Sequence, residues 1–335
     1  DTSQPHQAFR DSLRGQRVTI PSLHELFPEW MPRFHPDWQK ARDEVLNPWL
    51  ERWVEEPYTC AKLQAANFTI FAAIVCADAS FDKLCTVAKY FAWYFVWDDP
   101  YQQKSKEYFE YTLLRRGSRP DLSSFTKGQQ MALLCWDEVG EHIRRFLCSN
   151  NCQTLAEVRT FACLEVREIL LETMLPFVES VDTVDSIYLH DNVPTVAEYW
   201  QRRDLTAAVY PVIATLFFIH DASTPVTSLK NPRLADLWKH TSYIVHITND
   251  MLSMPKEAKD NQIEGLVPVL MMNYGIDCST AMQWSFRLVQ EIVKAIRDIE
   301  RYLLEDTEKG EVNALLKKVF ISGCKDVAMG LIHWR

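Results

Sequence analysis

Apolar residues recur at the spacing of an α-helix along most of this chain. In the stretch 67–85 they stand at Phe68, Phe71, Ala72, Val75 and Cys76, which is the i, i+3, i+4, i+7, i+8 pattern of one buried helix face. Alternating patterns typical of strands are scarce. The longer periodic segments are Lys127–Leu147, Thr154–Val178, Thr195–Phe218, Asn231–Glu257, Ile263–Asn273, Cys278–Glu305 and Glu311–Trp334. The pattern predicts one all-α domain over residues 1–335, with about ten helices.

Glycine is rare in this sequence, and large apolar side chains are common. Nine of 335 residues are glycine, against an average of roughly 7%, and eleven are tryptophan. This composition argues against turn-rich β folds and disordered chains. Residues 86–97 are apolar almost all round and are expected to form a central helix. Residues 1–35 are polar and are expected to be extended, because the residue before Pro21 avoids the helical region.

The charge and the cysteines limit the classes of partner and compartment. The formal net charge is −9, so nucleic acid is not an expected partner. The longest apolar run lies between Asp204 and His220, and it is shorter than the roughly 18 residues that a membrane span needs. Nine cysteines without a C-x-x-C pair indicate free thiols in a reducing compartment. We expect a cytoplasmic protein with no transmembrane segment, and its oligomeric state, including a homodimer, stays open.

Two adjacent aspartates, Asp98 and Asp99, follow the apolar run that ends in Phe95-Val96-Trp97. Removing neighbouring carboxylates from water costs several kcal/mol unless something neutralises them. A divalent cation such as Mg²⁺ would do so, because it prefers hard oxygen ligands. The alternative is a solvated helix end, where acidic pairs are common. This pair alone does not decide between the two.

A second polar cluster lies inside a periodic segment. Asn249, Ser253 and Glu257 are spaced at i, i+4 and i+8, which places them on one stripe of a helix. An amide, a hydroxyl and a carboxylate in a row offer only oxygen ligands, and such a set suits Mg²⁺ better than Zn²⁺. The spacing therefore indicates a magnesium site.

These residues resemble the signature of a known family. The pattern N-D-x-x-S-x-x-x-E, which here spans Asn249 to Glu257 and includes Lys256, is similar to a motif of the class I terpene cyclases. The Lys256–Gly275 region and the Gly330–Trp334 ending resemble the fungal branch of that family. Asp98-Asp99 resembles their aspartate-rich motif. The segment Glu198–Ala207 is similar to the one that carries the family's diphosphate-sensing arginine, which would be Arg203, with the helix break at its end. The resemblance covers roughly residues 19–334.

The resemblance implies both a fold and a reaction. The fold would be a single helical bundle around a central active-site cavity. The enzyme would ionise an allylic diphosphate with the help of three Mg²⁺ ions, because metal ions and cationic side chains stabilise the charge that develops on the leaving group. The implied metal ligands are Asp98, Asn249, Ser253 and Glu257. The implied diphosphate ligands are Arg203 and Lys256.

The resemblance also implies a cavity that shields a carbocation. Aromatic faces attract cations by about 2 kcal/mol or more when water is excluded. The resemblance places aromatic residues of the pocket at Phe71, Phe95 and Trp334, although ordinary core packing would explain each of them singly. Trp93, Tyr94 and Trp97 are expected in the core.

The sequence departs from the family pattern at three places. The third carboxylate of the aspartate-rich motif is replaced by Gln102, which can ligate a metal but carries no charge. Pro255 lies inside the predicted ligand helix and is expected to kink it between Ser253 and Glu257. The family's closing Arg-Tyr pair falls just beyond Arg335 if Trp334 matches the family's tryptophan, so the C-terminus is expected to be incomplete; a second alignment makes Arg335 that arginine.

The leading hypothesis is a Mg²⁺-dependent sesquiterpene cyclase. It would act on farnesyl diphosphate, release diphosphate and form a cyclic hydrocarbon or alcohol. A chain-elongating prenyltransferase is the alternative within the same chemistry, but such enzymes carry two aspartate-rich motifs, and here the second is replaced by the Asn/Ser/Glu set. A non-catalytic helical binding protein with a degenerate metal site is the alternative from another class, because of Gln102 and Pro255. The sequence does not indicate the product.

Overall fold

The computed structural model describes most of the chain, and the described part is helical without strands. The described residues are 3–13, 15–97, 103–149, 164–180, 194–220, 231–260, 262–306 and 317–334. The elements are α1 (Ser3–Leu13), η1 (Leu23–Leu26), α2 (Trp38–Lys40), η2 (Ala41–Leu46), α3 (Asn47–Trp53), α4 (Pro57–Ala66), α5 (Phe68–Val75), α6 (Phe81–Val96), α7 (Gln103–Leu114), α8 (Lys127–Ser149), α10 (Val196–Thr206), α11 (Val209–Ile219), α12 (Pro232–Lys259), α13 (Leu266–Tyr274), α14 (Cys278–Asp306), η4 (Lys317–Ser322) and α16 (Gly323–Trp334). Residues 164–180 are also helical.

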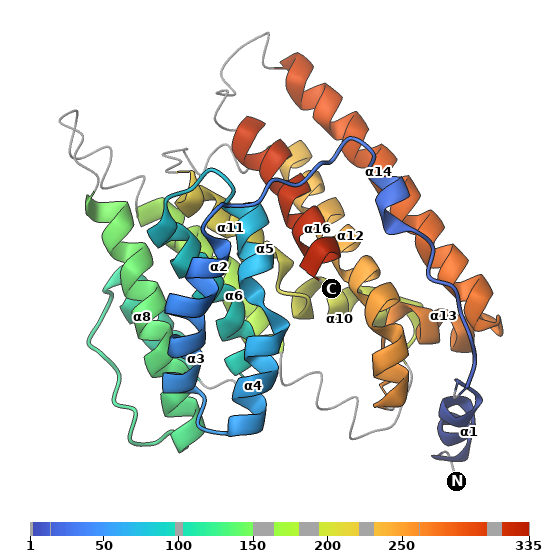
Figure 1. The fold of residues 1–335 in the computed structure, drawn as a ribbon, viewed down its shortest axis with the longest axis horizontal. Helices are drawn as coiled ribbons and strands as arrows, with labels where there is room; N and C mark the ends of the chain where they lie inside the picture. The colour runs from blue at the N-terminus through green and yellow to red at the C-terminus, as the bar shows by residue number, and fades with distance from the viewer. Residues whose placement is uncertain are drawn as a thin grey trace.

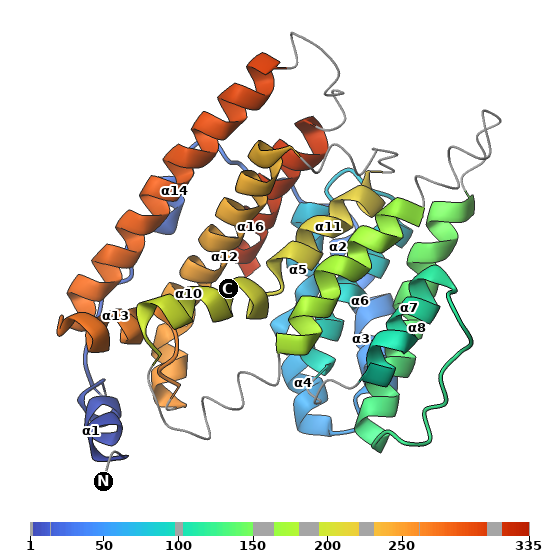
Figure 2. The same ribbon diagram turned by 180° about the vertical axis from the view of Figure 1, so that it is seen from behind.

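The helices form one bundle in which α16 is central. It packs against α5 on one side and against α12 on the other. Helices α2 to α8 lie on the α5 side, while α13 and α14 lie outside α12 (Figure 1). Seen from behind, α10 and α11 follow one another across the middle of the bundle (Figure 2). Helix α11 contacts α6, α12 and α16, so it links the two sides. The expected all-α architecture is confirmed.

Tryptophans build much of the core beside α6. Trp93 is fully buried, and its ring lies 4.8 Å from the ring of Trp136 and 5.7 Å from that of Trp97. The Trp93 indole N–H donates to the carbonyl oxygen of Ala132 at 3.0 Å, which satisfies its polar atom. Trp93 and Trp97 are therefore core residues, as the sequence predicts. Among the described residues, six cysteines are free and buried, and none of the described helices is both long and apolar enough to cross a membrane.

Two predicted helical segments are broken by local signals. The stretch 67–85 divides between α5 and α6, because the Ser80 hydroxyl accepts from the Lys83 backbone N–H and starts a new helix. The stretch Thr195–Phe218 divides at Ala207–Ala208. Its start is a capping box: the Glu198 carboxylate accepts from the Thr195 N–H at 2.7 Å, and the Glu198 N–H donates back to the Thr195 hydroxyl.

The expectation of an extended segment over residues 1–35 is wrong at its start. Residues 3–13 form α1, because a proline in the first helical turn is tolerated and the residues that follow include good helix formers. The strap (residues 15–36) then runs beside α14 (Figure 1). Arg33 binds both carboxylate oxygens of Asp78, at 2.6 and 2.7 Å. The ring of His24 lies 4.9 Å from that of His333, so the strap also contacts the end of α16.

Asp326, in the first turn of α16, lies near the Arg33–Asp78 pair. Burial, together with the charge of Asp78, raises the pKa of Asp326 to about 7, although Arg33 and Lys325 oppose the rise. Such a carboxyl group binds its proton more tightly in the folded state than in the unfolded state. Its stabilising contribution is therefore complete only at a pH below the unfolded-state pKa of about 3.9. That contribution is lost as the pH rises through about 7.

We therefore expect the melting temperature to fall between pH 5 and pH 8, and to fall less in Asp326→Asn. The asparagine has no carboxyl proton to lose, so its stability should depend less on pH. Thermal unfolding in matched buffers measures the difference. Glu29→Gln, a charge removal at an exposed position, is the control. Equal pH dependence in the parent and in Asp326→Asn would contradict the assignment.

Candidate active site

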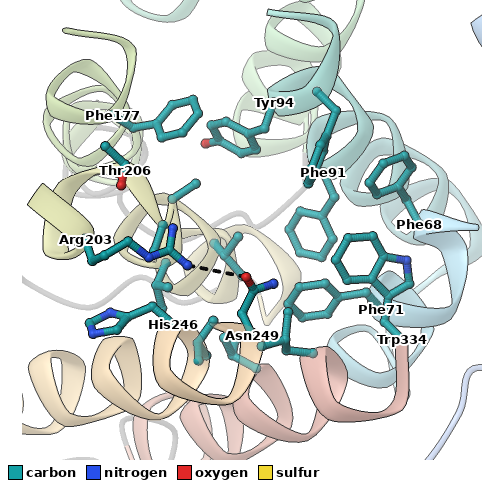
Figure 3. Close-up of a pocket in the computed structure, with 18 residues that line it drawn as sticks. Phe68, Phe71, Phe91, Tyr94, Phe177, Arg203, Thr206, His246, Asn249 and Trp334 are labelled. Atoms are coloured by element: carbon teal, nitrogen blue, oxygen red, sulfur yellow. Dashed lines mark hydrogen bonds between the residues drawn. The ribbon is translucent and has the colours of Figure 1, made fainter. Parts of the chain in front are cut away.

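An apolar pocket of about 200 Å³ lies at the centre of the bundle. Its walls come from α5, α6, the helix at 164–180, α10, α11, α12 and α16 (Figure 3). Aromatic side chains dominate one side. They are Phe68, Phe71, Phe91, Tyr94, Phe95, Phe177 and Trp334. The three aromatic residues that the sequence predicts for a pocket are all among them, and Tyr94, expected only in the core, is a pocket residue too.

Trp334 organises the aromatic wall. Its indole N–H donates to the Ala66 carbonyl oxygen. Its ring lies 5.4 Å from that of Phe68 and 6.0 Å from those of Phe71 and Phe95. Phe95 is half exposed, so it stands where the wall meets solvent. The last turn of α16 is therefore part of the pocket.

Gly330 allows this wall to form. A Cβ atom at Gly330 would lie 2.4 and 2.6 Å from two ring carbons of Phe71, which is closer than side chains pack. The ring of Phe71 in turn lies 4.9 Å from that of Phe91. A glycine at this position of α16 therefore makes the space in which Phe71 reaches the pocket.

The other side of the pocket is polar. There Arg203 of α10 meets Asn249 of α12 (Figure 3), and it also contacts Asp250 of the same helix. The Arg203 guanidinium donates to Asp250 Oδ1 at 2.6 Å and to Asn249 Oδ1 at 3.3 Å. Asp250 also accepts from the Tyr199 hydroxyl at 2.9 Å and from the Leu266 backbone N–H at 2.8 Å. Three helices thus meet at one carboxylate.

Sequence reasoning found Arg203 and Asn249 but missed Asp250 and Tyr199. The signals were present: Asp250 stands inside the motif, and Tyr199 precedes Arg203 by four residues, on the same helix face. Asp250 is 3% exposed and Arg203 is 17% exposed at the side chain. Burial alone would lower the pKa of Arg203, but the combined effect of Asp250, Tyr199 and Glu257 outweighs burial and raises that pKa. The same burial and charge raise the pKa of Tyr199 well above its usual value.

Arg203 retains capacity for an anionic ligand. Its Nε atom is buried and has no hydrogen-bond partner among the residues that the structure describes. Asp250 binds one terminal nitrogen and leaves that Nε–H unpaired. A guanidinium can bind two oxygens of a phosphate at once. The arrangement is therefore a fixed cation with a spare donor at the edge of an apolar cavity.

The predicted helix break follows Arg203 directly. Helix α10 ends at Thr206, and Ala208 has φ 55°, in the left-handed region, before α11 starts at Val209. A non-glycine residue in this region costs about 1–2 kcal/mol. Thr206, Ala207 and Ala208 all line the pocket. The strained turn thus brings backbone to the pocket wall close to Arg203.

The predicted ligand stripe lies on α12, which continues through Pro255 to Lys259. Asn249 lines the pocket, Ser253 is buried, and Lys256 is exposed. Burial raises the pKa of Glu257, and the nearby charge of Asp250 raises it further, while Ser253 and Arg203 oppose the rise. A Cβ on Gly265 would lie 3.3 Å from Glu257 Oε2, so the start of α13 closes over this carboxyl group.

The side chains on this stripe fit a hard divalent cation. Among the described residues, the buried Ser253 hydroxyl interacts only with the Glu257 carboxyl, and burial disfavours the anionic form of that carboxyl. Both features leave oxygen atoms available to a metal. In the described part of the chain, no three His, Cys, Asp or Glu side chains gather around one point. Asp98, Asp99 and Gln102 lie outside the described residues, as does Arg335.

Comparison with protein families gives one match. The model of terpene synthase family 2, C-terminal metal binding, matches residues 89–295. This range includes the aspartate pair, Arg203 and the whole Asn/Ser/Glu stripe, and it covers more than half of the chain.

Curated fungal proteins are similar over nearly the whole length. A sesquiterpene cyclase of Aspergillus oryzae, hepA, is 23% identical, with 98% of this chain and 90% of the relative covered. The silphinene synthase peniA of Penicillium patulum is 22% identical, with coverages of 97% and 85%.

Among solved structures, linalool/nerolidol synthase from Streptomyces clavuligerus superimposes with a TM-score of 0.73 at 15% identity, covering 95% of this chain and 99% of that one. An α-eudesmol synthase gives the same TM-score at 14% identity, with coverages of 95% and 98%. At such low identity the likeness shows the fold.

We expect Asp250→Ala to lower the free energy of unfolding by about 3–5 kcal/mol, because it leaves Arg203 buried without its counter-charge. Urea unfolding measures the change. Asp236→Ala on the same helix is the matched control: its ion pair with Arg233 is half exposed and spans 3.9 Å, and such pairs contribute about 0–1 kcal/mol. Equal losses in the two variants would contradict a central role for the buried pair.

Gly330→Ala should lower the free energy of unfolding by about 1–3 kcal/mol, because the new methyl group must displace the ring of Phe71. The double variant Gly330→Ala with Phe71→Leu should recover part of that loss, because leucine has no ring at this place. A double-mutant cycle of denaturant unfolding measures the coupling. If the losses of the two single variants simply add in the double variant, the close approach of Gly330 to Phe71 is not a packing constraint.

Proposed function

This chain belongs to terpene synthase family 2, and on that basis we propose that it is a Mg²⁺-dependent sesquiterpene cyclase acting on farnesyl diphosphate. A class I terpene cyclase of the fungal type is a lyase that acts on a prenyl diphosphate, and the fungal relatives and the all-α fold agree with this assignment. The finer statements, on the metal, the chain length of the substrate and the residue roles, are our proposal.

The observation that carries the proposal is the division of the pocket into two ends. One end holds Arg203 with its spare donor, beside Asn249. Most of the remaining wall is aromatic or aliphatic. A prenyl diphosphate has the same division, with a polyanionic head on an apolar chain. The substrate would therefore lie with its diphosphate at Arg203 and its chain against Phe71 and Trp334.

Arg203 would bind the diphosphate and stabilise the charge that grows on it as the carbon–oxygen bond breaks. Donors that are held in place before the reaction stabilise developing charge most effectively. Asp250 and Tyr199 hold the guanidinium in a fixed orientation. Lys256 is exposed one helical turn beyond Ser253 and would contribute a second cation from solvent.

The metal would be held by Asn249, Ser253 and Glu257 on α12 and by Asp98, which follows α6 in the sequence. When bound, Mg²⁺ neutralises diphosphate oxygens and so favours departure of the leaving group. Glu257 binds a metal as the carboxylate, and a bound cation would offset the burial that disfavours this form. By family resemblance the complete site holds three ions.

The aromatic wall would protect the carbocation that remains. Phe71, Phe91 and Trp334 present ring faces or edges around the apolar end. Ring faces attract a cation by about 2 kcal/mol or more when water is absent, and they offer no lone pair for capture. A cavity of about 200 Å³ lies below the roughly 300–1,000 Å³ of sites for drug-sized ligands. The choice of a fifteen-carbon substrate rests instead on the relatives, one of which is a sesquiterpene cyclase.

We expect the full chain to release diphosphate from farnesyl diphosphate and to form a cyclic hydrocarbon or alcohol, but only with Mg²⁺. The test is incubation with geranyl, farnesyl and geranylgeranyl diphosphate, followed by mass analysis of the extract and assay of free diphosphate. Longer prenyl diphosphates as products would instead support a chain-elongating transferase. Neither product nor diphosphate from any substrate would defeat the proposal and favour a binding protein.

Asp98→Asn and Asn249→Ala should each lower turnover by about 10²–10³-fold, the size of effect seen when one stabilising group for developing charge is removed. Circular dichroism and melting temperature show whether the fold is retained. Asp236→Asn, which removes a carboxylate from the exposed face of α12, is the matched control. Near-parent activity in either site variant would refute the role assigned to that residue.

A further inference from the structure

His246 is a pocket residue that the proposed function leaves without a role. It lies on α12, one helical turn before Asn249, and lines the pocket beside Arg203 (Figure 3). Its side chain is completely buried. Neither Nδ1 nor Nε2 has a hydrogen-bond partner within the described ranges. A buried imidazole with both nitrogens unpartnered is unusual and calls for a reason.

The surroundings of His246 keep its imidazole neutral. The rings of Tyr199, Trp200 and Tyr243 lie 6.0, 5.4 and 5.5 Å from its ring. Burial lowers the pKa of His246 well below its usual value, and the charge of Arg203 lowers it further. A neutral imidazole carries one N–H and one nitrogen lone pair. His246 therefore offers a proton acceptor at the wall of the pocket.

Packing alone does not explain this histidine. Leaving a buried polar group unpaired costs about 1–3 kcal/mol. Phenylalanine would make similar contacts with the three neighbouring rings and would carry no such cost. The other buried histidine of the described chain, His35, is bonded at both ring nitrogens, to the Ala79 carbonyl oxygen and to the Asp37 backbone N–H. Of the two buried histidines in the described chain, only His246 has both ring nitrogens unpaired.

We propose that His246 accepts the proton that is lost when the final carbocation of the reaction becomes an alkene. This inference rests on the proposed function and adds its terminating step. A carbon–hydrogen bond next to the cationic carbon breaks, and its electron pair becomes the second bond of the new alkene. The proton goes to the lone pair of an imidazole nitrogen. The imidazolium then loses that proton to water when the product leaves.

A weak base is sufficient for this step. A carbocation gives up a neighbouring proton very readily, so a nitrogen with a low pKa can still accept it. Histidine is the side chain most often used to move a proton in enzymes. The position beside Arg203 places the acceptor near the diphosphate end of the pocket (Figure 3), so the released diphosphate would stabilise the imidazolium until the product departs.

The test uses the full chain with Mg²⁺ and the prenyl diphosphate that the parent converts. His246→Phe should melt at or above the parent temperature, because it removes the unpaired nitrogens. It should release diphosphate within about threefold of the parent rate, while its yield of the parent alkene falls by about 10²-fold, the lower end of what a positioned base contributes. Products of other deprotonations or of water capture should replace that alkene.

Two variants keep the test decisive. His246→Gln retains a hydrogen-bonding side chain without a basic nitrogen, so it should lose the same alkene and gives the answer if His246→Phe does not fold. Tyr243→Phe removes one hydroxyl from a packing neighbour outside the pocket lining, and its product profile should match the parent.

An unchanged product profile in an active His246→Phe or His246→Gln would overturn this inference and leave the proposed function standing. Loss of diphosphate release in both folded variants would also overturn it, because His246 would then act in ionisation. A parent product that is solely an alcohol would exclude the deprotonation. Absence of any diphosphate release from the parent would instead overturn the proposed function itself.

Discussion

The buried ion pair between Arg203 and Asp250 is the interaction on which the polar end of the pocket depends. It joins α10 to α12, and the Leu266 N–H adds the start of α13 to the same carboxylate. A pair this buried is costly to form unless its remaining donors and acceptors are satisfied. Tyr199 and Leu266 fill the carboxylate side, while Arg203 Nε stays unpaired among the described residues. The pair therefore stabilises three helices and leaves one donor for a ligand.

The aromatic and aliphatic part of the pocket meets a different requirement, which is to exclude water and strong nucleophiles. Its wall is assembled from α5, α6 and α16, and the close approach of α16 at Gly330 places Phe71 beside Trp334. Polar atoms at this boundary are few and are left unpaired in the described chain, as at Thr206 and His246. Unpaired buried groups and the left-handed Ala208 cost stability. At a binding site such costs are tolerated when the site must remain able to bind and react.

Local sequence patterns predicted the helices well where the apolar period was long and uninterrupted. Helix α12 was expected over Asn231–Glu257 and spans Pro232–Lys259, because its period continues across Pro255. The pattern failed where a cap interrupts an apolar run, since Ser80 starts a new helix that periodicity alone does not reveal. It also failed at α1, where a polar helix carries little apolar signal. Tyr94 is a core residue, as expected, and it also borders the pocket, because one helix face can border both core and cavity.

The sequence by itself determined the helical class, the family resemblance and the candidate ligands on α12, because helical spacing and a nine-residue motif are both local properties. Only the tertiary structure decided which residues meet. Asp250 binds Arg203 across 47 positions of sequence, Gly330 admits Phe71, and His246 is buried beside Arg203 with no partner in the described chain. The physical reason is that packing, charge pairing and exclusion of water depend on distances between helices, and no local pattern in one helix encodes those distances.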